Sequence, residues 1–149
     1  MDPTEFNARC SIARSLDVLG EKWTLLILRE AFRGRARFSE FRDSLGVARD
    51  ILANRLATLV EYGVLEKRAY RDENARERFE YVLTPAGRDL RVVLVALTEW
   101  GDRHRALPTG PSVAYVEEAS GQPVHLEFVT ADGRPVPASV VTSVFADAV

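Results

Sequence analysis

Around Gly63 the sequence pattern changes abruptly from that of a helix to that of a strand. Residues 48–62 are predicted to form a helix, because apolar side chains recur on one face, formed by Ile51, Leu52, Leu56, Leu59 and Val60. Glycine adopts the left-handed backbone that ends a helix at little cost. The next residues, VLEKRAY (64–70), are predicted to form a strand. The chain therefore passes from helix to strand at one residue.

A second strand is predicted over RFEYVL (78–83), where Phe79, Tyr81 and Leu83 alternate with more polar neighbours. Between the strands, residues 71–77 contain no apolar side chain except Ala75. We therefore expect a two-stranded ribbon with an exposed, charged tip.

Further helices are predicted before this point, each ending at a glycine. They lie within residues 12–19, 21–33 and 37–45, and they end at Gly20, Gly34 and Gly46. The helix over 21–33 is apolar nearly all round, as a central helix should be, and Ser39 is the candidate N-cap of the next one. The short segment SLGVARD separates that helix from the one over 48–62, which suits a helix-turn-helix.

A last long helix is predicted from Pro85 to about Arg103, with Thr84 as its N-cap. It is more apolar than a lone surface helix should be, so another surface must cover it. The segment ALPTGPS then indicates a linker. Beyond it, short strands are predicted over 112–119, 123–130 and 135–141, with Asp132-Gly133 as a tight turn. We expect one domain over residues 1–105 and a β-rich appendage over 106–149.

Composition narrows the class of protein. The chain of 149 residues is 46% hydrophobic and 28% charged, which is typical of a soluble globular protein. It has no apolar run long enough for a membrane span and no signal peptide pattern, so we expect no membrane partner. A single cysteine excludes an internal disulfide and indicates the cytoplasm. His104 and His125 lack metal-ligand spacing, and no cofactor is expected.

The net charge of −2 hides an asymmetry along the chain. Residues 33–78 contain 11 Lys and Arg against 8 Asp and Glu, a local charge of +3. Residues 106–149 contain one Arg against 5 acids, a local charge of −4. Nucleic-acid binding requires a basic surface on one face rather than a basic chain, so the region 33–78 qualifies. An ordinary solvated charged face is the alternative.

Helices, a two-stranded ribbon and another helix follow each other in the order of a winged helix-turn-helix. The blocks CSIARSLDVLGEKWTLLILREAFRG, RFSEFRDSLG, ILANRLATLVEYGVLEKR, LTPAGRDL and EWGDRH resemble the HxlR-type transcriptional regulators, which are related to the MarR group. The resemblance covers residues 10–104 and implies a mainly α fold with a small β component. It also implies a homodimeric, sequence-specific DNA-binding regulator. Its dimer interface would include the last long helix, at Leu90, Val93, Leu94, Leu97 and Trp100.

The predicted recognition helix, 48–62, turns its polar face away from Leu52 and Leu56. On that face Arg49 is expected to pair with guanine and Asn54 with adenine, and Ala53 to touch a thymine methyl group. Asp50 either accepts from cytosine or repels the DNA backbone. Arg55 lies at the edge of the buried face, so we expect a phosphate contact or an internal salt bridge.

Backbone contacts are expected on either side of this helix. In the ribbon, Arg76 and Arg78 are the preferred candidates for contacts with phosphates or with the minor groove, and the further candidates are Arg71, Lys67 and Arg68. The acids Asp72, Glu73 and Glu77 oppose such contacts. Arg37 and Ser39 lie where a helix begins, and helix N-termini attract phosphate.

Cys10 is the candidate redox sensor. It lies at the start of a helix near Arg9 and Arg14, and both features favour a thiolate. Several HxlR-type regulators sense electrophiles or oxidants through a cysteine at this position. The alternative is a small buried residue at the dimer interface. Without a second cysteine, a disulfide would join two chains or a small thiol.

The sequence thus predicts a homodimer bound to a pseudo-palindromic double-stranded operator and modulated by a small-molecule effector or by chemistry at Cys10. A winged helix that binds protein instead of DNA is the alternative. An enzyme is disfavoured, because there is no nucleophile–base pair, metal set or phosphate-binding loop in the sequence. The appendage has three open roles: to close an effector pocket, to pack on the partner subunit, or to cap the dimer helix.

Overall fold

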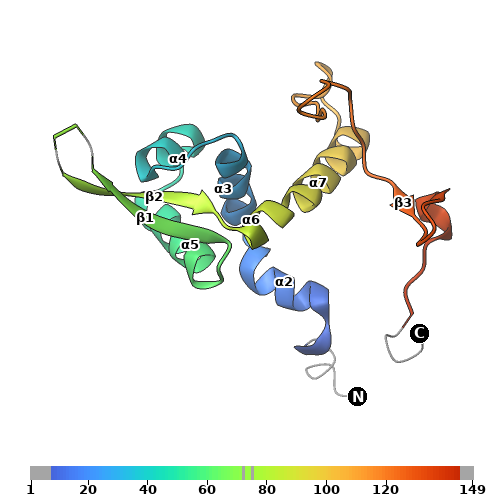
Figure 1. The fold of residues 1–149 in the computed structure, drawn as a ribbon, viewed down its shortest axis with the longest axis horizontal. Helices are drawn as coiled ribbons and strands as arrows, with labels where there is room; N and C mark the ends of the chain where they lie inside the picture. Colours follow the sequence, from blue (N-terminus) through green and yellow to red (C-terminus); the bar gives the residue numbers. More distant parts are fainter. Residues whose placement is uncertain (1–7, 72, 75, 145–149) are drawn as a thin grey trace. The chain divides into compact units, whose positions relative to one another are not determined.

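The computed structural model describes residues 8–71, 73–74 and 76–144 (Figure 1). The chain forms two compact units, Met1–Leu94 and Val95–Val149. The domain boundary expected between residues 105 and 106 stays a prediction. The elements are α2 (Ser11–Leu19), α3 (Lys22–Phe32), α4 (Phe38–Leu45), α5 (Arg49–Glu61), β1 (Leu65–Arg71), β2 (Glu77–Leu83), α6 (Pro85–Asp89), α7 (Arg91–His104), β3 (Phe128–Val129), β4 (Pro135–Val136) and the 3₁₀ turn η1 (Ala138–Val140).

The core of the first unit lies between α3, α4, α5 and the base of the β1–β2 hairpin. Its fully buried apolar side chains are Ile27, Leu28, Phe41, Leu52, Leu56, Leu59 and Leu65. The hairpin is antiparallel and projects away from the helices (Figure 1), and we call it the wing. A mainly helical unit that carries a two-stranded wing is the predicted fold class, which is confirmed.

Gly63 explains the abrupt change from α5 to β1. Its φ is +70°, and the Val64 N–H donates to the Leu59 carbonyl at 2.8 Å while the Gly63 N–H donates to Val60 at 3.0 Å. This pair of bonds is a Schellman motif, which satisfies the last carbonyls of a helix within two residues. The chain therefore enters the strand at Leu65, which is buried. The predicted helix end is confirmed.

Thr84 and Gly87 fix α6 against that junction. The Thr84 hydroxyl accepts from the Gly87 N–H at 3.0 Å and donates to the Gly63 carbonyl at 2.5 Å, so the predicted N-cap is confirmed. Gly87 lies so close to β1 that a Cβ atom there would be 2.2 Å from the Val64 carbonyl oxygen. The glycine of the LTPAGRDL block is thus required by packing, whereas its φ is unexceptional.

The helix predicted from Pro85 to Arg103 is in fact two helices, α6 and α7, with a break at Leu90. There the Leu90 N–H donates to Gly87, three residues back, at 3.2 Å, which is a tighter turn than an α-helix makes. Leu90 keeps right-handed helical angles, so the apolar periodicity continues through the break and conceals it.

Ser39 is not the N-cap of α4, because the helix begins earlier and Arg37 occupies the cap position. The Glu40 carboxylate accepts from the backbone N–H groups of Ala36 and Arg37, at 2.9 Å each. The same short segment adds to the wing, since Arg37 forms an isolated bridge with Glu80 in β2. So short an extended segment has no periodicity, and the sequence therefore did not predict this bridge.

The tail contains less strand than predicted. Residues 112–119 contribute only the isolated bridge between Val116 and Pro123, and the other two predicted strands reduce to β3 and β4, which pair antiparallel. Proline at 123, 135 and 137 removes the N–H groups that longer ladders require. The turn at Asp132-Gly133 is confirmed, with φ of +82° at the glycine. Among the described residues, no helix is long and apolar enough to cross a membrane.

Candidate nucleic-acid interface

The outer face of α5 is polar and exposed. Leu52, Leu56 and Leu59 are fully buried, and this fixes the rotation of the helix. Four predicted base-contacting residues consequently lie on the exposed face, namely Arg49, Asp50, Ala53 and Asn54. The first turn of this helix is the part that a recognition helix inserts into a groove.

Contacts with neighbouring side chains restrain parts of this face. The Arg49 guanidinium lies over the Phe38 ring, 5.3 Å from its centre, so α4 supports the arginine. The Thr58 hydroxyl donates to the Asn54 carbonyl at 3.0 Å, which leaves the Asn54 side chain outside that bond. Asp50 lies in the first helical turn, where a carboxylate interacts favourably with the helix dipole. That structural role competes with cytosine recognition.

Arg55 points toward the edge of the buried face, as expected. Its guanidinium lies 4.0 Å from the carboxylate of Glu21, the residue that caps α3. The two side chains are 30% and 64% exposed, so water screens the pair and its energy is small. Of the two roles expected for Arg55, the internal salt bridge is the one with a contact in this structure.

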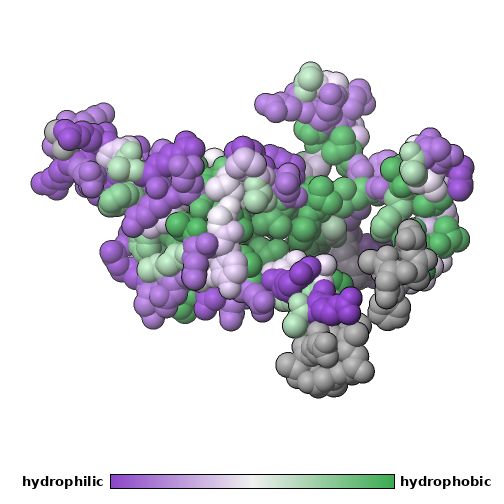
Figure 2. All heavy atoms as spheres, turned by 60° about the horizontal axis from the view of Figure 1, so that its bottom comes forward, coloured by the Kyte–Doolittle hydropathy of each residue, from purple (hydrophilic) through white to green (hydrophobic). Residues whose placement is uncertain are grey.

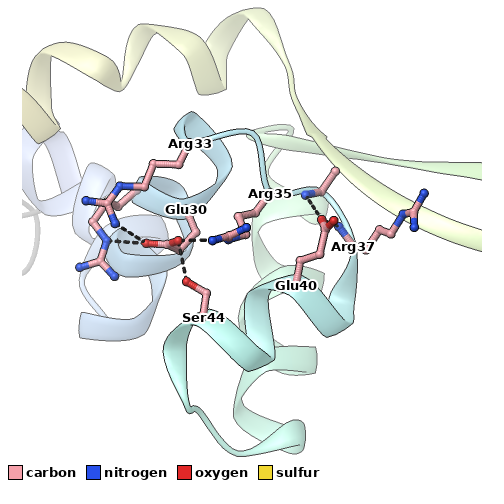
Figure 3. Close-up of polar contacts among 8 residues, drawn as sticks. Glu30, Arg33, Arg35, Arg37, Glu40 and Ser44 are labelled. Carbon is pink, nitrogen blue, oxygen red and sulfur yellow. Dashed lines mark hydrogen bonds and ion pairs between the residues drawn. The ribbon is translucent and has the colours of Figure 1, made fainter.

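The start of α4 combines a cation with an anion. The Arg37 guanidinium lies over the Tyr70 ring of β1, 4.8 Å from its centre. Beside it, hydrogen bonds from the backbone N–H groups of Ala36 and Arg37 hold the pKa of the Glu40 carboxyl below its ordinary value (Figure 3). Ser39 is exposed in the first turn. Any phosphate that binds here therefore meets an ionised carboxylate as well as Arg37.

The register of the wing divides its charged side chains between two faces. Tyr70 is paired with Arg78, and directly paired residues share a face, so Arg78 lies on the side of the Arg37–Tyr70 contact. Lys67 lies on the other face, over the Phe79 ring at 4.4 Å. Arg76 is exposed just before β2, as is Arg71 at the end of β1. The predicted opposing charge of Asp72 and the apolar tip residue Ala75 lie outside the described residues.

A buried carboxylate that the sequence analysis missed connects α3 to α4. Glu30 is 1% exposed, and Figure 3 shows cationic side chains converging on it together with Ser44 of α4. Its oxygens lie 2.8 Å from Arg29, 3.0 Å from Arg33 and 3.5 Å from Arg35, and the Ser44 hydroxyl donates to it at 2.6 Å.

Burial opposes the ionisation of Glu30, but the bonds from Ser44 and Arg29 and the charges of Arg29 and Arg33 outweigh it. The pKa of Glu30 is consequently lowered. The available signal was an acid at helical spacing within an apolar stripe, followed by arginines at 33 and 35. Through Ser44 the cluster joins α3 to α4, the helix that comes directly before α5 in the chain.

Cys10 is the N-cap residue of α2 and is half-buried. The nearby Arg14 guanidinium donates to the Ser11 hydroxyl at 3.1 Å. The Arg14 charge therefore contacts the neutral Ser11 side chain, which lies at the same end of α2 as Cys10. Within the described part of the chain, no group of three or more His, Cys, Asp or Glu residues is arranged to hold a metal ion.

The residues expected in the dimer interface fall into two groups. Leu90 and Leu94 are half-buried and pack against the core of their own unit. Val93, Leu97 and Trp100 are 39%, 48% and 59% exposed. Exposed apolar side chains also occur on α2, at Ile12 and Leu16. In Figure 2 the wing is largely hydrophilic, whereas apolar surface is visible elsewhere on the chain.

Comparison with known proteins supports this geometry. A profile of the HxlR-like helix-turn-helix family matches residues 18–108. The uncharacterized HTH-type transcriptional regulator Rv3095 of Mycobacterium tuberculosis is 44% identical over 112 residues, which cover 75% of this chain and 70% of that protein. YdeP of Bacillus subtilis, also named as an uncharacterized HTH-type transcriptional regulator, is 30% identical over 97 residues, which cover 64% of this chain and 74% of that protein. Neither name describes an enzyme.

Solved structures give the same result. PA1607, described as a transcription-factor candidate, superposes with a TM-score of 0.80 at 43% identity, covering 95% of this chain and 99% of that one. That match necessarily extends into the tail. The redox regulator HypR in its reduced form superposes with a TM-score of 0.59 at 29% identity and covers 64% of this chain and 94% of its own. The exposed helix α5, the wing and these matches together establish that the chain belongs to the HxlR-like helix-turn-helix family of DNA-binding transcriptional regulators.

Proposed function

We propose that the protein is a cytoplasmic, sequence-specific regulator that binds its operator as a homodimer. The observation that carries the proposal is the rotation of α5, which buries three leucines and exposes Arg49, Ala53 and Asn54 at its first turns. In this arrangement α5 enters the major groove, while Arg37 at α4 and Arg76 and Arg78 in the wing contact the DNA backbone.

The dimer is supported by apolar surface that the chain does not cover itself. Val93, Leu97 and Trp100 form a row on α7 at helical spacing, and α2 adds Ile12 and Leu16. A two-fold dimer built on these helices presents two copies of α5. It therefore selects a pseudo-palindromic operator with half-sites roughly 34–36 Å apart.

Regulation is assigned to a small-molecule effector or to oxidation of Cys10. Support for the cysteine comes from its place at the start of α2, within the proposed dimer surface, and from the similarity to HypR, which is described as a redox regulator. Oxidation there would alter the packing of α2, and hence the spacing of the two α5 helices.

A second candidate function is recognition of a protein by the same winged helix. It is favoured by the acids beside the cations of the proposed surface, namely Glu21 at Arg55, Glu40 at Arg37 and Glu66 at Arg68. Acids that neutralise arginines weaken attraction to phosphate.

Fluorescence anisotropy separates these functions. A labelled fragment from upstream of the protein's own gene is titrated against random DNA of equal length, at several salt concentrations and with reduced protein. We expect preferential binding that weakens with salt. Asn54→Ala should lose discrimination by about 1–3 kcal/mol, and Arg49→Ala should behave similarly. Arg103→Ala, at the exposed end of α7, is the matched control and should bind as the wild type does.

Unchanged specificity in both α5 variants would remove this helix from the interface. Oxidant treatment of the wild type and of Cys10→Ser then tests the regulation: a response that survives in Cys10→Ser assigns it elsewhere. Binding that never exceeds that of random DNA, in protein shown to be folded, favours the protein-binding function.

A further inference from the structure

The tail, which we define as residues 106–144, is built from hairpins. In the first, the Val124 N–H donates to the Tyr115 carbonyl at 3.0 Å, and the Glu117 N–H donates to Gln122 at 2.8 Å. The second consists of β3 and β4 (Figure 1). Each is a two-stranded ribbon closed by a polar turn.

Neither hairpin has a core. None of the described residues from 96 to 144 is buried. In β3 the consecutive residues Phe128 and Val129 are 53% and 61% exposed, so both faces of the second hairpin carry apolar surface. The other large exposed apolar residues of the tail are Leu107, Val116, Val124, Leu126, Val140, Val141 and Val144. An isolated two-stranded hairpin is at best marginally stable in water, so a fixed tail requires a covering surface.

The tail is attached to α7. The Thr98 hydroxyl lies 3.3 Å from the Tyr115 hydroxyl, and the Leu126 N–H donates to the Glu99 carboxylate at 2.9 Å. These contacts hold the first hairpin and the segment that follows it beside the helix whose Leu97 and Trp100 form the proposed dimer face. A partner subunit that covers this face therefore comes within reach of the tail.

Charge indicates which part of the partner it meets. The tail exposes Glu118 and Glu127, and neither forms an ion pair with a described residue. Helix α2 also lacks a buried residue, exposes Ile12 and Leu16 at 72% and 56%, and has Arg14 near its start. Arg14 likewise forms no ion pair within the described ranges. Arg9 lies just before α2 and Arg14 in its first turns, whereas Asp17 lies further along. The N-terminal end of α2 is therefore the part of this apolar helix that complements the acidic tail.

We infer that the tail is a dimer arm, which packs on α2 of a second copy of this chain. The inference rests on the proposed homodimer and extends it. By two-fold symmetry each protomer gives its arm and receives one, so the hairpins and both α2 helices become buried together. The arm thus provides the core that the tail lacks.

Cysteine cross-linking in the full chain tests this pairing, because Cys10 at the start of α2 is the only native cysteine. A tagged Cys10→Ser, Ala119→Cys variant, whose only thiol is in the exposed turn of the first hairpin, is mixed with untagged wild type and treated with a bismaleimide. We expect a cross-linked hybrid of one tagged and one untagged chain. The control is tagged Cys10→Ser, Asp43→Cys, whose thiol lies on exposed α4, and it should give no hybrid.

Light scattering of each mixture before cross-linking distinguishes a failure of the proposed homodimer from a failure of the proposed arm. A monomeric wild type would contradict the proposed homodimer, and the arm with it. A dimer that yields no hybrid would leave the homodimer standing and overturn the arm. The single variant Ala119→Cys, which retains Cys10, tests the remaining possibility. Cross-linking within one chain, without hybrids, would mean that the tail packs on α2 of its own chain. That result would also overturn the inference.

Discussion

The first unit buries many of its apolar side chains in a core, whereas the tail leaves its apolar side chains on the surface. In the first unit, side chains from α3, α4, α5 and β1 fill a core in which seven apolar residues are at most 1% exposed. In the tail, residues of similar hydrophobicity stay on the surface, because short hairpins broken by proline cannot cover both their faces. Apolar content alone therefore does not tell a buried core from an exposed apolar surface.

The difference has a practical consequence for mutants. A change in the core of the first unit should appear as a loss of folding stability, whereas a change in the tail should appear as a loss of association. Paired substitutions can test this distinction.

The largest effect is expected in the core of the first unit. Leu56→Ala should lower the free energy of unfolding by about 2–5 kcal/mol, because it leaves a cavity beneath the proposed recognition helix. Leu107→Ala, at a 65% exposed position of the tail, is the matched substitution and should change it by less than about 0.5 kcal/mol. Urea unfolding followed by circular dichroism measures both. Equal losses would mean that the tail is as well packed as the core.

Gly87→Ala should come next. The new Cβ would lie 2.2 Å from the Val64 carbonyl oxygen, a backbone atom that cannot move without shifting β1, so a loss of about 1–3 kcal/mol is expected. Gly101→Ala is the control, because no atom lies within 4 Å of its added Cβ and alanine favours the α7 helix. We expect the melting temperature to fall in Gly87→Ala and to rise in Gly101→Ala. An unchanged melting temperature in Gly87→Ala would contradict the close approach of α6 to β1.

Glu30→Gln should cost about 1–2 kcal/mol, since it leaves Arg29, Arg33 and Arg35 without their shared carboxylate. The wild type should also be sensitive to acid. The folded-state pKa values of Glu30 and Glu40 are both lowered, so their contribution is complete above the ordinary glutamate value of about 4.3. It is lost as the pH falls through the lowered values. Unfolding measured between neutral and acid pH should show a smaller acid loss in Glu30→Gln; an identical loss would mean that Glu30 does not contribute.

The smallest effect on folding is expected for Phe128→Ala in β3. It should leave the unfolding of the first unit within about 0.5 kcal/mol of the wild type. The dissociation constant of the proposed dimer should nevertheless rise about tenfold, because the substitution removes an aromatic side chain from the proposed arm. Sedimentation at a series of concentrations measures this. A large loss of folding stability, with association unchanged, would reverse the comparison between the two regions.

The sequence predicted the order of elements well, because the signals were local and mutually consistent. The leucines of α5, the left-handed Gly63 and the Thr84-Pro85 start each specify their own neighbourhood. The fold class followed from that order. The exposed face of α5 followed from the leucines on its opposite side.

The errors have in common that a distant or competing contact decided the outcome. Glu40 determined the start of α4 in place of Ser39, because it bonds backbone groups held next to the wing. Glu30 was missed because only the folded chain brings Ser44 to it. Leu90 and Leu94 share the periodicity of Leu97 and also pack against their own core, so their part in a dimer interface stays a prediction. Periodicity shows that an apolar helix face must be covered by another surface, but it does not identify that surface.

The acids beside the proposed DNA surface act as built-in counterions. Glu21, Glu40 and Glu66 lie next to Arg55, Arg37 and Arg68. A phosphate that engages Arg55 or Arg68 displaces the carboxylate paired with that side chain, whereas Glu40 stays bound to the backbone N–H groups of Ala36 and Arg37. The logarithm of affinity falls with the logarithm of salt concentration by about 0.9 per neutralised phosphate. For this protein we expect the slope to count only the arginines that have no carboxylate paired with them. Its magnitude should therefore be smaller than the total number of arginines on the proposed surface would give.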